Sequence, residues 1–212
     1  MKTQVFAYLK ECEDDSMPHY FSEDNDTLKS NPKEIAFRVH GTNFTCFTDH
    51  GVFAKDGLDR GTYVLLQYLK VDSSMIHALD LGCGYGSIGL VLAKTFGLTV
   101  DMVDVNQRAI DLSNQNAAIN GVNVRVFYSQ GFEQITKTYD LIVTNPPIRI
   151  GKQHMYKLFE DAKNHLTKNG ELVFVINKKH GALSAIKYVE TLYQNVEIIG
   201  KSKGFFVISC KN

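Results

Sequence analysis

Three short motifs carry side chains whose types and spacing suit the binding of a nucleotide-like cofactor and a planar amine. The first is Asp80-Leu81-Gly82-Cys83-Gly84-Tyr85-Gly86, whose glycines permit a tight turn and close backbone approach to a ligand. The carboxylate of Asp80, directly before the turn, would repel a pyrophosphate but neutralise a cationic ligand group. A dinucleotide fingerprint would also place its third glycine at Ser87 rather than at Gly86. The motif therefore disfavours a nicotinamide-dependent oxidoreductase.

The second motif is a single acid, Asp104, which lies 22 residues beyond Gly82 at the end of a predicted strand. An acid at about this distance from a glycine turn can accept both hydroxyl hydrogens of a ribose. The alternative is an acid that stabilises the start of the following helix through the helix dipole. Asp101 is nearby, but it points to the other face of the strand and is the weaker candidate.

The third motif, Asn145-Pro146-Pro147-Ile148, follows another predicted strand. Two successive prolines end a strand and hold the preceding residue in an extended conformation. The side-chain oxygen of Asn145 and the carbonyl of Pro146 can then accept both hydrogens of one planar amino group. This would free the nitrogen lone pair to attack an electrophile. The alternative is an ordinary turn that only ends the strand.

Strands alternate with helices from residue 76 onward, which predicts a parallel sheet with crossover helices. Parallel strands place their carboxyl ends, and hence the three motifs, at one edge of the sheet. The link Lys201–Gly204 is too short for a crossover helix, so the last two strands must be antiparallel. The predicted strands are 76–81, 98–103, 122–127, 139–144, 171–176, 196–200 and 205–210, with helices at about 87–96, 107–119, 154–166 and 183–192.

The N-terminal part of the chain differs from this pattern. Residues 11–34 are polar and acidic, which indicates a loop. Apolar residues alternate with other residues over 35–39, and a turn leads into a second strand at 44–47, which predicts a β-hairpin. Helical spacing over 62–69 predicts a helix that leads into the sheet. We therefore predict an appendage at residues 1–60 and a main α/β domain at 61–212.

Composition limits the classes of protein to which this chain can belong. The chain has 212 residues, of which 23 are basic, 23 are acidic and 44% are hydrophobic. This composition excludes an intrinsically disordered protein, a collagen and a disulfide scaffold. There is no apolar run long enough to span a membrane and no leader pattern, so the protein is expected in the cytoplasm. The four cysteines and seven histidines lack the spacing of metal ligands, so no metal is expected.

Charge is unevenly distributed along the chain. The first 60 residues have a net charge of −4, whereas residues 137–212 have a net charge of +6. A lysine-rich surface of this kind is either simply solvated or favours contact with a nucleic acid.

The three motifs together resemble those of the class I S-adenosylmethionine-dependent methyltransferases, in the branch that methylates exocyclic or amide nitrogen. Residues 60–212 follow this resemblance in order and spacing, which implies a seven-stranded Rossmann-like sheet with its last strand antiparallel. Further segments resemble the small-methyltransferase-domain proteins that modify guanine N2 in small-subunit ribosomal RNA. These segments are Gly51-Val52-Phe53, Leu58-Asp59-Arg60-Gly61-Thr62, Asn116-Ala117 and Asn120.

The resemblance assigns expected roles to individual residues. It implies that Asp80, Gly82, Gly84 and Gly86 hold the methionine end of S-adenosylmethionine, Asp104 its ribose, and Gln130-Gly131-Phe132 its adenine. Asn145, with Pro146 and Pro147, would bind the target amine. Phe53 would cover the cofactor or an extruded base, unless it only packs in the core. Many members of this branch stack an aromatic ring on the target base at the position of Ile148, which is aliphatic here.

The sequence thus predicts an S-adenosylmethionine-dependent N-methyltransferase whose partner is RNA, with guanine N2 of small-subunit ribosomal RNA as the target. Three alternatives stay open at this point. They are methylation of a protein glutamine amide, methylation of adenine N6 in DNA, and a catalytically silent recognition module. Some guanine-N2 enzymes of the resembling family have a second, degenerate half for recognition, whereas this chain has one half.

Overall fold

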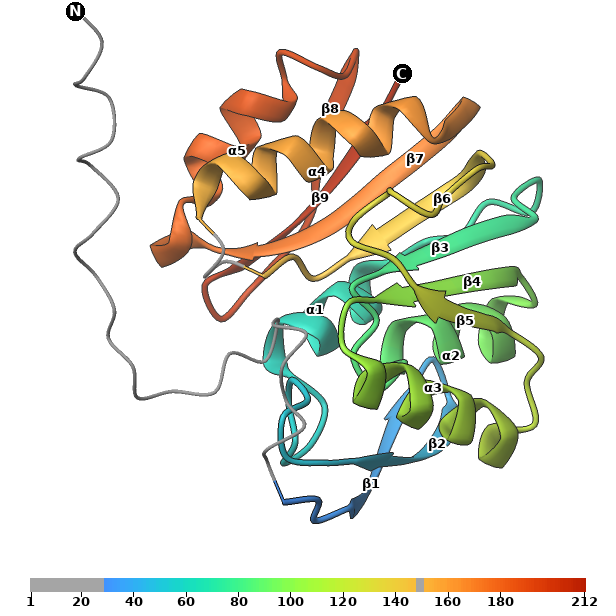
Figure 1. Ribbon diagram of the computed structural model, residues 1–212. Helices are drawn as coiled ribbons and strands as arrows, with labels where there is room; N and C mark the ends of the chain where they lie inside the picture. Colours follow the sequence, from blue (N-terminus) through green and yellow to red (C-terminus); the bar gives the residue numbers. More distant parts are fainter. Residues whose placement is uncertain (1–28, 148–150) are drawn as a thin grey trace, which may run out of the picture.

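The computed structural model describes residues 29–147 and 151–212, which form two sheets with flanking helices (Figure 1). Most of the predicted polar N-terminal loop, and Ile148, lie outside the described residues. The strands are β1 (Lys33–Val39), β2 (Thr42–Thr48), β3 (His77–Leu81), β4 (Thr99–Asp104), β5 (Arg125–Tyr128), β6 (Tyr139–Thr144), β7 (Leu166–Asn177), β8 (Asn195–Ser202) and β9 (Phe205–Lys211). The helices are α1 (Arg60–Tyr68), α2 (Ser87–Phe96), α3 (Gln107–Asn120), α4 (Lys152–Asn164) and α5 (Ala182–Val189), with a 3₁₀ turn η2 (Lys178–His180).

The main sheet has seven strands in the order β5-β4-β3-β6-β7-β9-β8. Strands β3 to β7 pair in parallel, whereas β9 is antiparallel to both of its neighbours, β7 and β8. Lys203 and Gly204 both have positive φ, as a two-residue hairpin turn requires. The predicted fold class, a mostly parallel sheet with an antiparallel last strand, is confirmed.

Successive residues of the central strands face opposite sides of the sheet, and each side has its own hydrophobic core. Ala78, Leu141 and Val143 pack with residues of α1, α2 and α3. Leu79 and Ile142 pack on the other side, with residues of α4 and α5. Figure 1 shows α4 and α5 on one side of the sheet and α2, α3 and the β1–β2 hairpin on the other. Near-continuous apolar strands of this kind are typical of a sheet covered on both faces.

Two strand boundaries differ from the prediction by three residues or more, each for a local reason. The predicted strand at 122–127 begins only at Arg125, because the backbone N–H of Val122 still bonds to Ala117 O at the end of α3. The predicted strand at 171–176 begins earlier, at Leu166, because Leu166 already pairs with Tyr139 ahead of a register shift in β6–β7. Neither difference moves a predicted site residue to another edge of the sheet.

The β1–β2 hairpin is attached to α3 by side chains that bond to its backbone. Asn116 Oδ1 accepts from Phe47 N (2.6 Å), and its Nδ2 donates to Phe47 O (2.8 Å). Asn120 bonds in the same way to both backbone groups of Thr45. Hydrophobic residues of the hairpin, including Phe44, belong to the same core as α1, α2 and α3. The division at residue 60 stays a prediction, and this shared core crosses it.

Two further observations concern only the part of the chain that the structure describes. It contains no helix that is long and apolar enough to cross a membrane. It also contains no group of three or more His, Cys, Asp or Glu side chains that could hold a metal ion. Cys46, Cys83 and Cys210 are buried free thiols, and Cys12 lies outside the described residues.

Candidate active site

Strand register brings the three sequence motifs to one level at the carboxyl edge of the sheet. Asp80 in β3 lies opposite Met102 in β4 and opposite Val143 in β6. Two residues further along each strand come Gly82, Asp104 and Asn145, side by side on three adjacent strands. Because side chains alternate, Asp80, Asp104 and Asn145 share the face covered by α1, α2 and α3. The sequence therefore predicted correctly that these motifs lie at the same edge.

The loop after β3 is shaped by glycines with positive φ. Gly82 and Gly84 have φ of +74° and +56°, and a Cβ atom at either position would meet nothing within 4 Å. These two glycines are therefore required by backbone conformation and leave open space above the loop. The N–H groups of Gly82 and Cys83 both bond to Val103 O (2.9 Å each), which ties the loop to the end of β4.

Asp80 is fully buried beneath this loop. Its Oδ2 accepts a hydrogen bond from Gly89 N in the first turn of α2 (2.8 Å), whereas Oδ1 has no partner among the described residues. Burial is the main cause that raises the pKa of Asp80 to about 7; the Gly89 bond opposes this rise and the nearby Asp104 adds to it. An unpaired buried carboxylate oxygen is costly, so this side chain is poised to accept a positive charge or a donor.

Asp104 is also buried, but both of its carboxylate oxygens have partners. Oδ2 accepts from Gly84 N (2.8 Å) and Oδ1 accepts from Asn106 N (2.9 Å). Burial raises its pKa, while the backbone N–H groups of Asn106 and Gly84 oppose the rise. A carboxylate offers about four lone-pair positions, so two bonds leave capacity for two hydroxyl donors. Asp101, by contrast, accepts from Tyr139 OH (2.8 Å) and pairs with Lys137 on the other side of the sheet.

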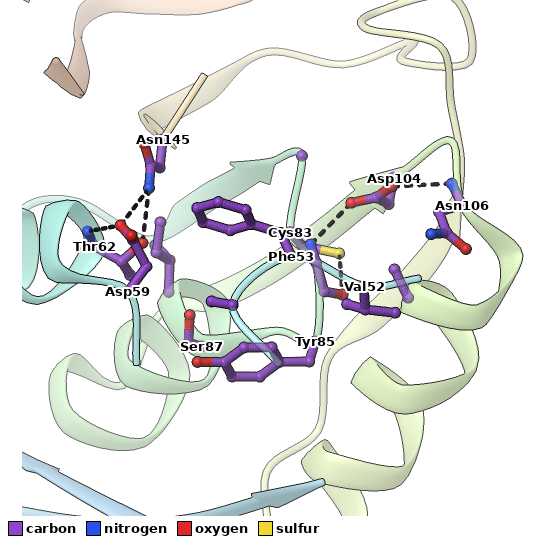
Figure 2. A pocket seen from close by; sticks show the side chains of 15 residues that line it. Val52, Phe53, Asp59, Thr62, Cys83, Tyr85, Ser87, Asp104, Asn106 and Asn145 are labelled. Atoms are coloured by element: carbon purple, nitrogen blue, oxygen red, sulfur yellow. Dashed lines mark hydrogen bonds between the residues drawn. The ribbon is translucent and has the colours of Figure 1, made fainter. Parts of the chain in front are cut away.

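A pocket at this edge is lined by the glycine loop, Asp104 and Asn145, and by apolar residues on its other side (Figure 2). The apolar lining comes from the segment after β2 (Val52, Phe53, Ala54) and from the helices α2 and α3 (Ile88, Ala109). The Phe53 side chain is 36% exposed, so it is not a buried core residue. Asp104 lines the pocket, whereas Asp80 is fully buried beneath the loop and is not among the residues that line it. An apolar wall with a few polar groups is typical of a pocket for a small molecule.

Asn106 holds the segment after β2 against this pocket. Its Nδ2 donates to Gly51 O (2.7 Å), while its Oδ1 accepts from Arg108 N (3.0 Å) as the N-cap of α3. One side chain therefore caps α3 and also fixes the segment that follows β2. Arg108 adds a second link, because its Nη1 donates to His50 O (2.6 Å).

The predicted adenine-flanking residues lie after β5 but do not line this pocket. Ser129 N bonds to Asp104 O (3.1 Å), which brings the loop beside the end of β4. Gln130 is exposed, and Gly131 has φ of +57°. The ring of Phe132 is buried and stacks on His165 at 4.6 Å between centroids, in the core beneath α4. The adenine role of this segment stays a prediction.

Asn145 is held by two side chains from a distant part of the chain. Its Nδ2 donates to Asp59 Oδ2 (3.0 Å) and to Thr62 Oγ1 (2.9 Å), at the start of α1 (Figure 2). Pro146 is buried and Pro147 half-buried. The sequence analysis did not identify Asp59 or Thr62 as site residues. Their spacing indicates only a helix N-cap, and nothing local connects them to Asn145.

The geometry fits S-adenosylmethionine, whose sulfonium is positively charged and whose ribose carries two hydroxyls. The fit rests on the unpaired buried oxygen of Asp80, on the remaining capacity of Asp104, and on the space that Gly82 and Gly84 leave above the loop. A ring such as Phe53 can cover the adenosine portion. These features define a class I methyltransferase site on a Rossmann-like sheet.

Comparison with known proteins agrees with this class. Residues 43–209 match the family described as "Methyltransferase small domain". The chain is 43% identical to the uncharacterized protein YbxB of Bacillus subtilis, over 91% of this chain and 98% of that protein. It is 35% identical to ribosomal RNA small subunit methyltransferase C of Aeromonas hydrophila, over 80% of this chain and 50% of that protein.

A solved structure shows the same fold. The 16S rRNA N2 methyltransferase RsmC of T. thermophilus, in complex with AdoMet and guanosine, superposes with a TM-score of 0.78 at 24% identity. The match covers 87% of this chain and 52% of that one, so the chain spans about half the length of the ribosomal RNA methyltransferases it matches.

The chain belongs to the small-domain family of class I methyltransferases, and its cofactor is S-adenosylmethionine, as the sequence predicted.

Proposed function

We propose that this chain transfers a methyl group from S-adenosylmethionine to the exocyclic N2 amine of guanine in small-subunit ribosomal RNA. The observation that carries the proposal is the orientation of the Asn145 amide. Its Nδ2 is committed to Asp59 and Thr62, which leaves Oδ1 as an acceptor beside the cofactor pocket. An acceptor fixed at this place is what an amine nucleophile requires.

Asn145 Oδ1 and the carbonyl of Pro146 would accept the two hydrogens of the target amine. These two bonds orient the nitrogen and weaken its conjugation with the base, so that its lone pair points toward the pocket. When bound, S-adenosylmethionine supplies a methyl group on a sulfonium: the N–C bond forms as the S–C bond breaks, and the sulfur keeps the electron pair. The methylated nitrogen then loses one proton to water. No strong general base is needed.

In this proposal Asp80, Gly82, Gly84 and Gly86 hold the methionine end of the cofactor and Asp104 holds its ribose. Phe53 either covers the cofactor or stacks on the target base. A base within a duplex must first be extruded, at a cost of a few kcal/mol, which favours guanines in loops or in partly assembled particles. Ile148 offers no ring for stacking. Two aromatic side chains line the pocket, Phe53 and Tyr85, and we assign the stacking role to Phe53 because it is exposed whereas Tyr85 is buried.

Exposed cations at the same edge of the sheet support RNA as the substrate. Lys178 and Lys179 follow the carboxyl end of β7, and Lys201 and Lys203 lie in or beside the β8–β9 turn. The two segments are joined by a bond from Lys178 N to Gly204 O (2.8 Å). Parallel pairing of β6 and β7 places these lysines at the same edge as Asn145. A phosphate backbone is attracted to such a group of lysines.

The names of the relatives also support this substrate, because several of them are ribosomal RNA small subunit methyltransferases C. Such a substrate places the protein in the cytoplasm, in agreement with the sequence-based expectation. The chain spans about half the length of those relatives, so we propose only that this domain carries a surface that contacts the RNA.

The proposal is tested by measuring transfer of labelled methyl from S-adenosylmethionine. Naked ribosomal RNA, small ribosomal subunits, DNA and RNA-depleted protein extract serve as parallel substrates, and Asn145→Ala is the control variant. We expect label in RNA that is lost in the variant, and nucleoside digestion should identify N2-methylguanine. Label only in protein would overturn the proposal in favour of glutamine methylation, and label only in DNA in favour of adenine methylation. Cofactor binding without any transfer would indicate a recognition module.

A further inference from the structure

One carboxylate oxygen connects the start of α1 to the proposed acceptor of the target amine. Asp59 Oδ2 accepts a hydrogen bond from Thr62 N (2.9 Å) as the N-cap of α1. The same oxygen accepts from Asn145 Nδ2 (3.0 Å), 86 residues away in sequence. The hydroxyl of Thr62 provides the second acceptor for Nδ2, at 2.9 Å. Both hydrogens of the Asn145 amide therefore have fixed partners.

The chemistry of Asp59 determines which way the amide is turned. An ionised carboxylate has no hydrogen to donate, so the atom of Asn145 that faces it must be the nitrogen. An amide turned by 180° would place its oxygen against a carboxylate oxygen and its NH₂ group against the NH₂ group of the substrate. Within residues 29–147 and 151–212, no group bonds to Asn145 Oδ1, so the acceptor is available.

Packing around Asp59 keeps this arrangement rigid. Thr62 is 4% exposed, and Gly61 is buried between Asp59 and Phe205 of β9. A Cβ atom at Gly61 would lie 2.9 Å from Asp59 Oδ2 and 3.0 Å from the Phe205 ring, so glycine permits the close approach. The start of α1 is thus held against the sheet at the point where β6 ends (Figure 2).

We infer that Asp59 and Thr62 are positioning residues that hold the amide of Asn145 in a single orientation, with Oδ1 presented to the target amine. The inference deepens the proposed function and rests on it, since it names what holds the proposed acceptor. Neither side chain touches the substrate in this role; both act through Asn145.

Two matched pairs of variants separate positioning from helix capping. Asp59→Ser keeps a good N-cap but is too short to reach Asn145, whereas Asp59→Asn keeps both the cap and an oxygen at the place of Oδ2. Thr62→Val removes the hydroxyl acceptor, and Thr62→Ser keeps it. We expect kcat to fall about tenfold or more in Asp59→Ser and Thr62→Val, and to stay within about threefold in Asp59→Asn and Thr62→Ser. The Kd for S-adenosylmethionine should stay within about twofold in all four.

A double-variant comparison identifies the route of the effect. In single-turnover assays on an Asn145→Ala background, Asp59→Ser should cause no further loss, because the group it positions is gone. An additional tenfold loss there would show that Asp59 acts by another route and would overturn the inference. Unchanged kcat in both Asp59→Ser and Thr62→Val would overturn it as well.

A second readout does not depend on the substrate. The side-chain NH₂ signals of Asn145 in a ¹⁵N-labelled protein, assigned by their absence in Asn145→Ala, should shift and exchange faster with solvent in Asp59→Ser and Thr62→Val. They should be little changed in Asp59→Asn and Thr62→Ser. If the NMR pattern holds but RNA is not methylated, the positioning inference stands and the proposed substrate fails. If the wild-type protein methylates RNA and these signals do not change, only the positioning inference fails.

Discussion

The carboxyl edge of the sheet is built differently on the two sides of β3. Toward β4, the carboxylates of Asp80 and Asp104 are held by backbone N–H groups of the glycine loop and the adjoining helices, within 20 residues in sequence. Toward β6, Asn145 is held by two side chains that are 83 and 86 residues away. Under the proposed function the first side holds the cofactor and the second the target amine, and we call them the cofactor side and the amine side. The cofactor side is formed by local motifs, and the amine side by tertiary contacts. The two sides should respond to different substitutions.

Asn145→Ala and Asp104→Ala are the strongest test of this division. Removing the acceptor at Asn145 should lower kcat by about 10²–10³ while leaving the Kd of S-adenosylmethionine unchanged, because the lost bonds serve the reacting amine. Asp104→Ala should raise that Kd by about tenfold to a hundredfold through loss of charge-assisted bonds to the ribose. Single-turnover kinetics and calorimetry measure the two quantities. A large change of cofactor affinity in Asn145→Ala would mean that the two sides are not separate.

Asn116→Ala tests how the β1–β2 hairpin is attached to α3. The segment that follows this hairpin covers the cofactor side. The substitution leaves Phe47 N–H and the carbonyls of Phe47 and Tyr85 without partners in a buried place, and it should lower the free energy of unfolding by about 2–3 kcal/mol. Chemical denaturation measures this. The control is Asn114→Ala, an exposed residue of the same helix, which should change it by less than about 0.5 kcal/mol. Equal effects of the two would contradict the role of Asn116.

Asp80 makes the cofactor side sensitive to pH. Since its pKa is about 7, binding of a positively charged cofactor should tighten about tenfold between pH 6 and pH 8 as the carboxylate ionises. Asp80→Asn should bind weakly with a much flatter pH profile. Calorimetry across this range is the measurement. A wild-type profile as flat as that of Asp80→Asn would rule out ionisation of Asp80 as the cause.

Rising pH should strengthen cofactor binding through Asp80, but it should lower the contribution of Asp80 to the stability of the folded protein. The pKa of Asp80 is 3.8 in the unfolded chain and about 7 in the folded protein. Between about pH 4 and pH 7 the folded protein therefore holds a proton that the unfolded chain has released. The contribution of Asp80 to stability is therefore greatest below about pH 4 and declines as pH rises to 7. Denaturation of the cofactor-free protein should show this decline relative to Asp80→Asn. A difference that grows in favour of the wild type with rising pH would contradict it.

The lysines beside the amine side should have the smallest effect. Lys178→Ala or Lys203→Ala should weaken RNA binding a few-fold and reduce the slope of log K against log salt by about one each. Lys168→Ala is the matched control, because it is exposed near the start of β7, at the opposite end of the strand. An equal loss in the control would place the RNA elsewhere on the surface.

The difference between the two sides also explains what could be predicted from sequence. The glycine turn, Asp80 and Asp104 could be placed at one edge of the sheet because each is recognised from a few neighbouring residues and from the strand that precedes it. Asn145 could be placed there for the same reason, through the prolines that follow it. The contacts of Asp59 and Thr62 with Asn145 could not be predicted, because a helix N-cap has many possible tertiary neighbours and local spacing does not select one.

The fold followed from periodicity more completely than the site did. Alternating strands and helices predicted the parallel sheet, and the short link before Phe205 predicted the antiparallel pair. The late start of β5 was not predicted, because the backbone N–H of Val122 bonds to the end of α3. The early start of β7 was not predicted, because it depends on pairing with a residue of β6. The position of β9 between β7 and β8 was not specified by the sequence, since it is a choice among long-range pairings.

The alignment of Gly82, Asp104 and Asn145 across three neighbouring strands limits where the chain can change in length. One residue inserted within β6 would turn Asn145 to the face covered by α4 and α5, away from α1. Two inserted residues would restore the face but move the amide about 6.6 Å along the strand, beyond the reach of Asp59. Viable insertions and deletions in descendants of this gene should therefore fall in the connections at the opposite edge of the sheet, where no motif has to keep its level.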